Sequence, residues 1–200
     1  MANIIKDQAS ILAKLSIEKL NEMQEEAIKS INSNHEVVLL SPTGSGKTLA
    51  FLLPIIESLD PNSEEIQALI IVPSRELAIQ IEQVVREMGT GYKTNVVYGG
   101  RSGSKEKIEL KHRPAILIGT PGRVADHLRR NRFSTESIKT LVLDEFDKSL
   151  EIGFEVEMKE IVESLGSIQT RILTSATNSV EIPKFVGLIK PIIIDYLDSA

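Results

Sequence analysis

Short apolar segments rich in β-branched residues alternate along the chain with segments of helical periodicity. Seven of these apolar segments predict strands, namely Val37–Leu40, Ala68–Val72, Asn95–Tyr98, Ala115–Ile118, Thr140–Leu143, Arg171–Leu173 and Pro191–Ile194. Several are apolar throughout, which is typical of strands buried on both faces. Between them, apolar residues recur at helical spacing in segments such as Leu77–Met88 and Phe154–Leu165. This alternation predicts βαβ units, and therefore a mostly parallel sheet with helices on both faces.

Helical patterns are also found near the two ends of the chain. Residues from Asp7 to about Ile31 predict a helical segment with candidate apolar positions at Ile11, Leu12, Leu15, Leu20, Met23 and Ile28. Before the last predicted strand, Glu181–Leu188 predicts one short helix. We therefore expect a single α/β domain over residues 1–200, with an N-terminal helical segment at about 1–31.

Composition narrows the class of protein. A length of 200 residues suits one well-buried domain. The absence of cysteine excludes disulfides and cysteine metal sites, and the three histidines are dispersed without a metal-binding spacing. No apolar run approaches the ~20 residues of a membrane span, and the N-terminus does not resemble a signal peptide. We expect a cytoplasmic monomer without a membrane partner. The net charge of −5 argues mildly against tight nucleic-acid binding.

A glycine-containing loop follows the first predicted strand and precedes a helical segment. In folds of this class, ligands bind at the carboxyl ends of the strands. Gly44 and Gly46 allow backbone N–H groups to turn toward phosphate oxygens, and the helix N-terminus adds its positive end. Lys47 can reach the β- and γ-phosphates, and the Thr48 hydroxyl can hold Mg²⁺. Ser41 occupies the position where this pattern usually opens with glycine. The predicted nucleotide-binding residues are Thr43, Gly44, Ser45, Gly46, Lys47 and Thr48.

An acidic segment follows the strand predicted at Thr140–Leu143. Downstream of a phosphate loop, Asp144 is placed to hold Mg²⁺, and Glu145 to orient or deprotonate the attacking water. Asp147 is one carboxylate more than hydrolysis requires, which suggests a coupling role. The alternative is an acid-rich helix N-terminus favoured by the helix dipole. The next predicted strand leads into Thr174–Thr177, whose hydroxyls could hydrogen-bond to Asp147 or cap a helix.

Together these segments resemble, in order, the first RecA-like domain of a superfamily 2 DEAD-box RNA helicase. Besides the phosphate loop, the matching segments are Pro73–Ala78 (P-T-R-E-L-A, with Ser for Thr), Gly99-Gly100 (GG), Thr120–Arg123 (T-P-G-R), Asp144–Asp147 (D-E-A-D, with Phe146 for Ala) and Ser175–Thr177 (S-A-T). The resemblance covers the chain from about Leu15 to Tyr196. It implies a three-layer RecA-like P-loop domain with a mostly parallel central sheet and helices on both faces.

The resemblance also implies roles for residues at the matching positions. Lys47 and Thr48 would bind the ATP phosphates and Mg²⁺, Asp144 would hold the metal, and Glu145 would be the catalytic base. Asp147 would couple hydrolysis to strand separation together with two hydroxyl residues, Ser175 and Thr177. The positions implied in RNA-backbone binding are Pro73, Arg75, Gly100, Thr120 and Arg123. Contacts of that kind predict little sequence preference and a salt-dependent affinity.

Some features depart from the family pattern or leave an alternative open. The family reads adenine with a glutamine preceded by Pro-Thr and, further upstream, an aromatic residue. Gln24 is present, but Glu22-Met23 precedes it and no aromatic residue occurs before Phe51, so a ring cannot stack on adenine from that side. The two candidate RNA-binding arginines could instead pair with neighbouring acids at helix starts. The sequence predicts no function for Phe146 other than packing under the phosphate loop.

The family's second RecA-like domain, which completes the ATP site with arginines, has no counterpart after Ser175–Thr177. Since an added arginine can be worth ~10³–10⁵ in phosphoryl-transfer rate, we expect nucleotide binding with little hydrolysis from this chain alone. The chain is expected to be one domain of a larger enzyme. Two other functions remain open: a P-loop ATPase or kinase that does not bind nucleic acid, and a non-enzymatic, nucleotide-dependent RNA-binding scaffold.

Overall fold

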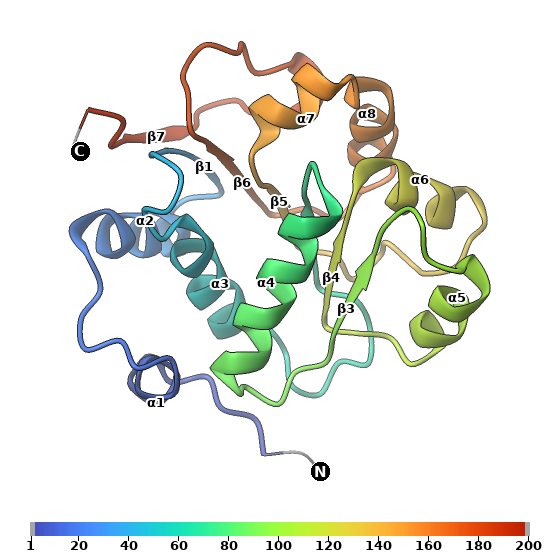
Figure 1. Cartoon of the computed structure of the whole chain (residues 1–200), viewed down its shortest axis with the longest axis horizontal. Coiled ribbons are helices and arrows are strands. Elements are labelled where there is room, and N and C mark those ends of the chain that lie inside the picture. The colour runs from blue at the N-terminus through green and yellow to red at the C-terminus, as the bar shows by residue number, and fades with distance from the viewer. Residues whose placement is uncertain (1–2, 199–200) are drawn as a thin grey trace.

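A computed structural model describes residues 3–198, in which seven strands alternate with α-helices (Figure 1). The strands are β1 (Glu36–Leu40), β2 (Ala68–Ile71), β3 (Thr94–Val97), β4 (Ile116–Gly119), β5 (Thr140–Leu143), β6 (Thr170–Ser175) and β7 (Ile192–Asp195). The α-helices are α1 (Gln8–Lys14), α2 (Glu22–Ser33), α3 (Lys47–Ser58), α4 (Arg75–Met88), α5 (Gly103–Lys111), α6 (Pro121–Arg129), α7 (Phe146–Ile152) and α8 (Glu155–Glu163). Every predicted strand is present, with its ends shifted by at most two residues.

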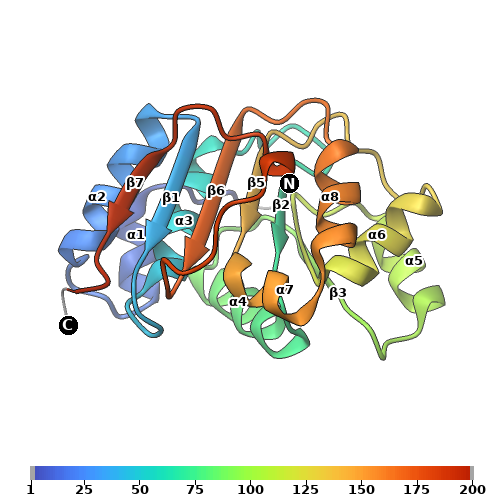
Figure 2. The same ribbon diagram turned by 90° about the horizontal axis from the view of Figure 1, so that it is seen from above.

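The seven strands form one sheet in the order β3-β4-β2-β5-β6-β1-β7, with β1 between β6 and β7 (Figure 2). Every strand pair in the described residues is parallel, so the predicted mostly parallel sheet is confirmed and is entirely parallel there. Helices or long connections separate consecutive strands, as parallel pairing requires. All the strands therefore end at the same edge of the sheet.

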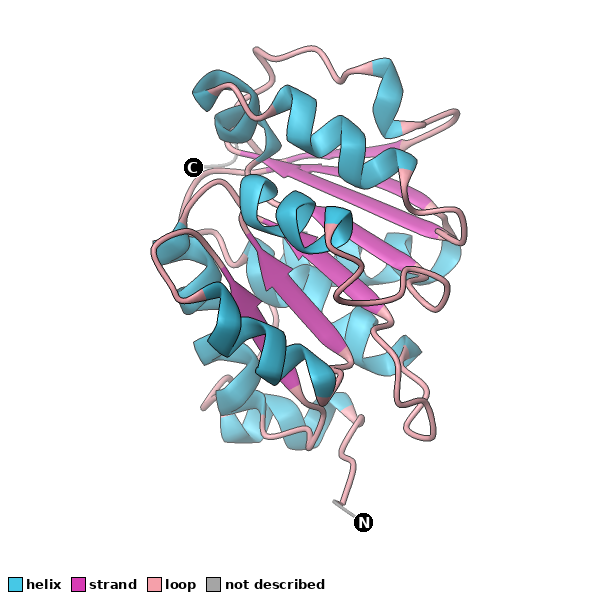
Figure 3. Cartoon of the chain, turned by 90° about the vertical axis from the view of Figure 1, so that its right-hand side faces the viewer, coloured by secondary structure: helices cyan, strands magenta, loops and turns pink. Residues whose placement is uncertain are grey.

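Helices cover both faces of the sheet, which confirms the predicted three-layer arrangement (Figure 3). Alternate residues of β1 point to opposite faces: Val37 and Leu39 join one core cluster, whereas Val38 and Leu40 join the other. The first cluster contains residues from α1 to α4, and the second contains residues from α5 to α8. Phe146 of α7 is 3% exposed and packs in the second cluster, on the face opposite α3.

The predicted N-terminal helical segment is present as two helices, whereas the helix predicted near the carboxyl terminus is wrong. The segment Asp7–Ile31 forms two helices, because the chain turns after α1, where Ser16 adopts a left-handed φ of 56°. Glu181–Leu188 contains only a 3₁₀ turn, η1 (Lys184–Val186), with Pro183 at its start and Gly187 at its end with a φ of 80°. Among residues 3–198, no helix has the length and apolar character needed to cross a bilayer.

The close approach of β4 to α6 requires glycine at residue 119. An added Cβ there would lie 2.5 Å from Cγ2 of Val124 and 2.9 Å from the carbonyl oxygen of Val97. We predict that Gly119→Ala lowers the free energy of unfolding by about 1–3 kcal/mol, the usual effect of overpacking, as measured by urea denaturation. The matched control is Gly122→Ala in α6, where an added Cβ meets no atom within 4 Å. Equal unfolding midpoints for the two variants would contradict this account.

Candidate functional site

The carboxyl-terminal edge of the sheet gathers all the segments that carried predicted chemistry. The strand order sorts them into two groups. Gly100, Thr120 and Pro73 follow β3, β4 and β2, which lie side by side on one half of the edge. Asp144, the segment Ser175–Thr177 and the phosphate loop belong to β5, β6 and β1, which are neighbours on the other half. The fold thus separates a candidate nucleotide half from a candidate nucleic-acid half.

Hydrogen bonds within the loop and from Lys47 hold the conformation of the phosphate loop Ser41–Gly46. Gly44 and Gly46 have φ angles of +82° and +92°, which other residues adopt only with strain. The Ser41 hydroxyl donates to Oγ of Ser45 at 2.7 Å, and Lys47 Nζ donates to the carbonyls of Ser41 and Pro42 at 2.5 and 2.8 Å. A phosphate would be a stronger partner for this ammonium than two carbonyls, because it would add the attraction of opposite charges to the hydrogen bonds.

The amino-terminal end of α2 is fastened to this loop by two amide side chains. Asn21 Nδ2 donates to the carbonyl of Ser45 at 3.0 Å, and Gln24 Nε2 donates to the carbonyl of Gly46 at 3.2 Å. The other end of the Gln24 amide accepts from the backbone N–H of Asn21 at 3.0 Å. Both ends of Gln24 are therefore bonded within the protein, and its role in reading adenine stays a prediction.

Asp144 is a buried carboxylate at the end of β5, 3% exposed. Burial raises the pKa of Asp144 to about 6, although the hydrogen bond from Thr174 and the charge of Lys47 lower it. The Thr174 hydroxyl donates to Oδ1 of Asp144 and accepts from the backbone N–H of Glu145 at 2.9 Å. From the sequence, this threonine was linked to Asp147 or to a helix cap, and not to Asp144. The parallel pairing of Leu143 with Leu173 places Asp144 and Thr174 opposite each other.

Glu145 has an unusual backbone conformation. Its φ of 49° is left-handed, which is uncommon for a residue other than glycine and is typical of functional sites. Its carboxylate lies 3.0 Å from Nζ of Lys148, and the side chain is only 17% exposed. The ion pair fixes the direction of the carboxylate. The role of Glu145 as catalytic base stays a prediction.

Asp147 is connected to the segment that follows β6. Its Oδ2 accepts from the Thr177 hydroxyl at 3.2 Å, while its Oδ1 is buried without a hydrogen-bond partner. The Ser175 hydroxyl donates to the carbonyl of Thr177 at 2.6 Å, and its oxygen accepts from the N–H of Thr177 at 3.0 Å. Ser175 thus shapes the turn that presents Thr177 to Asp147. Whether this contact couples hydrolysis to strand separation stays a prediction.

The oxygen ligands at this edge fit Mg²⁺ bound together with a nucleotide. The Asp144 carboxylate and the Thr48 hydroxyl are the candidate protein ligands. In the described part of the chain, no group of three or more His, Asp or Glu side chains could hold a metal ion. Mg²⁺ in phosphate sites usually takes one or two carboxylates, substrate phosphates and several waters, which matches this sparse set.

A family model of DEAD/DEAH box helicases matches residues 21–185. The chain belongs to the DEAD/DEAH box helicase family. The match covers the phosphate loop, the acidic segment and Ser175–Thr177, and it confirms the resemblance inferred from those motifs. The seven-stranded parallel sheet is accordingly that of a RecA-like helicase domain.

Similar proteins carry matching names. The chain is 40% identical over 169 residues to the ATP-dependent RNA helicase CshA of Limosilactobacillus reuteri, which covers 84% of this chain and 34% of that protein. It is 43% identical over 157 residues to the DEAD-box ATP-dependent RNA helicase RhpA of Helicobacter pylori, covering 78% and 32%. It is 34% identical over 177 residues to CshA of Bacillus subtilis, covering 88% and 36%. The chain thus spans about a third of the length of these relatives.

On the other half of the sheet edge, Arg75 and Gly100 are exposed candidate RNA ligands. The Arg75 side chain is 58% exposed and pairs with Glu76 at 3.2 Å. Gly100, with a φ of +89°, lies beside it, since an added Cβ there would be 3.9 Å from Nη1 of Arg75. Thr120 is the N-cap of α6, and Pro73 is buried after β2. An exposed ion pair of this kind contributes little to stability, so Arg75 can leave Glu76 at small cost.

Arg123 has a different environment, because its guanidinium joins a buried network. Its Nε donates to Oε2 of Glu106 at 2.6 Å, and its Nη2 donates to the carbonyl of Arg101 at 3.1 Å. Glu106 is fully buried and also contacts Nε2 of His127 at 2.7 Å and accepts from the N–H of Tyr98 at 3.1 Å. Burial alone would raise the pKa of Glu106, but these hydrogen bonds lower it overall. Arg123 therefore has a structural role, and its contact with RNA stays a prediction.

The buried carboxylate of Asp144 predicts a specific pH dependence of stability. Its pKa rises from 3.8 to about 6 on folding, so its protonated form stabilises the fold below about pH 4 and this stability is lost as pH rises through 6. We predict that Asp144→Asn is more stable than the wild type at pH 8, by on the order of 1–3 kcal/mol without ligands, and equally stable at pH 4. Urea titrations across this pH range measure the difference.

Asp126→Asn provides a control of opposite sign. The hydrogen bond from Arg130 lowers the pKa of Asp126, so its carboxylate stabilises the fold at neutral pH and loses this effect in acid. Asp126→Asn should therefore be less stable than the wild type at pH 8. An Asp144→Asn difference that is the same at pH 4 and pH 8 would show that Asp144 does not titrate in this range.

Proposed function

We propose that this chain is the ATP-binding domain of an ATP-dependent RNA helicase and that its bound nucleotide is Mg²⁺–ATP. One observation carries the proposal: three candidate segments lie at the carboxyl ends of three adjacent strands. The phosphate loop follows β1, Thr174–Thr177 lies at the end of β6, and Asp144-Glu145 follows β5. The names of the similar proteins support it. The relatives are about three times as long as this chain, so we assign RNA unwinding to a protein of that length and not to this domain alone.

In this proposal, the phosphate loop binds the β- and γ-phosphates. Lys47 exchanges the carbonyls of Ser41 and Pro42 for phosphate oxygens. The backbone N–H groups at the start of α3 face the same phosphates, and the helix dipole favours their charge. Mg²⁺, when bound, supplies charge neutralisation at the phosphates, and Thr48 and Asp144 are the residues that would hold it.

Glu145 receives the proton of the attacking water. The water oxygen bonds to the γ-phosphorus, the bond from this phosphorus to the bridging oxygen breaks, and ADP leaves. The proton moves from the water oxygen to the Glu145 carboxylate, whose direction the ion pair with Lys148 sets. Asp147 and Thr177 lie next to this base and connect α7 to the end of β6. We propose that this contact transmits the change of the nucleotide to the rest of the protein. Efficient turnover requires arginines from a second RecA-like domain.

RNA lies across the other half of the edge in this proposal. Arg75 and the backbone around Gly100 contact phosphates, while Arg123 supports the start of α6 from within. Such contacts carry no base information, so binding has little sequence preference. Since the chain is acidic overall, with a net charge of −5, its affinity for RNA by itself is weak.

The catalytic assignment predicts different effects for two substitutions. Glu145→Gln keeps the shape of the side chain but cannot accept a proton, so calorimetry should show ATP affinity near that of the wild type. With a second domain attached, its hydrolysis should fall by at least the ~10²–10⁴-fold typical of general acid–base catalysis. Lys47→Ala should abolish measurable ADP binding. Loss of ATP binding in Glu145→Gln, with a normal rate for whatever is bound, would make Glu145 a structural residue.

The RNA assignment predicts that Arg75→Ala weakens binding of single-stranded RNA to a similar extent for different sequences. It should also reduce the slope of log affinity against log salt by about 0.7, the value for one phosphate contact on a single strand. Arg86→Ala is the control, because Arg86 lies at the other end of α4 and also pairs with a glutamate. Unchanged RNA binding in Arg75→Ala, or nucleotide affinity independent of RNA, would favour an ATPase that does not use nucleic acid.

A further inference from the structure

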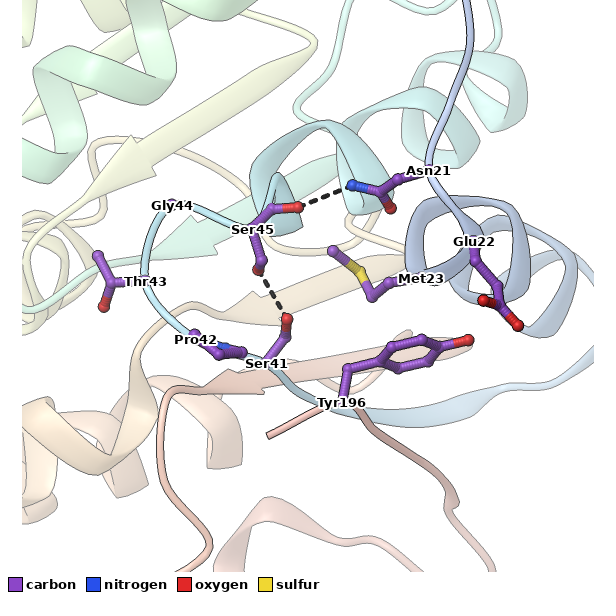
Figure 4. Close-up of a pocket in the computed structure, with 9 residues that line it drawn as sticks. All are labelled: Asn21, Glu22, Met23, Ser41, Pro42, Thr43, Gly44, Ser45 and Tyr196. Atoms are coloured by element: carbon purple, nitrogen blue, oxygen red, sulfur yellow. Dashed lines mark hydrogen bonds between the residues drawn. The ribbon is translucent and has the colours of Figure 1, made fainter. Parts of the chain in front are cut away.

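A pocket of about 430 Å³ opens beside the phosphate loop (Figure 4). Its lining comes from Asn21–Met23, Ser41–Ser45 and Tyr196. The volume lies within the range of about 300–1,000 Å³ that is typical of small-molecule sites. When the phosphates of a nucleotide bind the loop, its ribose and base lie next to the loop. This pocket adjoins the loop and could hold them.

Tyr196 is the only aromatic residue in the lining of this pocket. It follows β7, the edge strand that pairs with β1, and its backbone N–H donates to the carbonyl of Leu40 at 2.8 Å. Leu40 immediately precedes the phosphate loop. The β7–β1 pairing therefore brings a ring from the carboxyl-terminal part of the chain to the start of the loop.

The ring of Tyr196 is held in place at both ends. Its hydroxyl donates to Oε2 of Glu26 in α2 at 2.5 Å, and this hydrogen bond raises the pKa of Tyr196 to about 12. Its backbone is fixed by the strand pairing, and the ring packs against the core cluster that contains Met23. In Figure 4 the ring lies along the side of the pocket with its hydroxyl directed away from the loop. A ring fixed beforehand loses little conformational freedom when a base stacks on it.

We propose that Tyr196 forms the aromatic wall of the nucleobase site and that a purine base stacks on its ring. This rests on the proposed function, because it requires the phosphates of the same nucleotide to bind the loop. Residues 1–50 contain no phenylalanine, tyrosine or tryptophan, so none of them can supply this wall. Since both ends of the Gln24 amide are bonded within the protein, stacking determines more of the selectivity than base-edge hydrogen bonds do. The site therefore prefers purines to pyrimidines and separates adenine from guanine only weakly.

Two substitutions, Tyr196→Ala and Tyr196→Phe, and three ligands test this wall. Tyr196→Ala should weaken ADP binding by about 5- to 150-fold, the range that one base–aromatic stack is worth, as measured by calorimetry with Mg²⁺. Its affinity for pyrophosphate, which has no base, should stay within about twofold of the wild type. Tyr196→Phe keeps the ring and loses only the bond to Glu26, so its affinity for ADP should stay within about threefold. UDP should bind the wild type more weakly than ADP, and this preference should disappear in Tyr196→Ala.

Tyrosine fluorescence gives a direct reading of stacking. The chain has three tyrosines and no tryptophan. With Tyr92 and Tyr98 replaced by phenylalanine, Tyr196 is the only strong fluorophore. ADP should quench it, and pyrophosphate should not.

Three results have separate meanings. Equal ADP affinity in Tyr196→Ala and the wild type would overturn the proposal while leaving nucleotide binding intact. A parallel loss of ADP and pyrophosphate affinity would also overturn it, because Tyr196 would then support the loop and not the base. Failure of the wild type to bind either ligand would refute the proposed function itself.

Discussion

A sheet whose strands all run in one direction is the constraint on which the rest of this structure depends. Parallel strands are covered by helices on both faces, so the interior of each strand is apolar and polar chemistry is confined to the strand ends. In β2, Ala68–Ile71 are all buried, and the first residues with accessible polar groups come after Pro73. Seven carboxyl ends at one edge then bring together segments about 130 residues apart in sequence, such as the phosphate loop and Thr174–Thr177.

Burial of two ionisable side chains, Lys47 and Asp144, destabilises their charged forms in the free protein, and a bound ligand of opposite charge would offset this effect. Burial lowers the pKa of Lys47 and raises the pKa of Asp144, so both groups are less readily charged than they would be in water. Each is held by neutral partners in the free protein: two carbonyls for Lys47 and the Thr174 hydroxyl for Asp144. Phosphate would give the ammonium an anionic partner, and Mg²⁺ would give the carboxylate a cationic one. The same burial that destabilises the free domain would therefore favour binding of the proposed metal–nucleotide pair.

The sequence predicts local features here much better than features that depend on distant pairing. Apolar strands and the glycine loop were predictable because each depends on residues close in the chain. The Asp7–Ile31 segment is helical, but its division into two helices was not predictable, because apolar spacing alone cannot show the left-handed turn at Ser16. Thr174 was not linked to Asp144, because their contact depends on the β5–β6 register. The position of Tyr196 could not be predicted either, since it depends on which strand lies beside β1. Buried Glu106 gave no signal, because its partners come from other elements.

The strand order also limits how the two halves of the edge can communicate. β5 lies beside β2, and the N–H of Asp144 donates to the carbonyl of Ile71 at 2.9 Å. Only Val72 separates Ile71 from Pro73, where the candidate RNA segment begins. A buried sheet with fixed register is a poor switch, because coupling requires an element with two alternative arrangements. The turn that follows β6 is the better candidate, since Thr177 is exposed and reaches Asp147 through a single 3.2 Å hydrogen bond. The buried, unpaired Oδ1 of Asp147 means that a second partner could be gained when this turn moves.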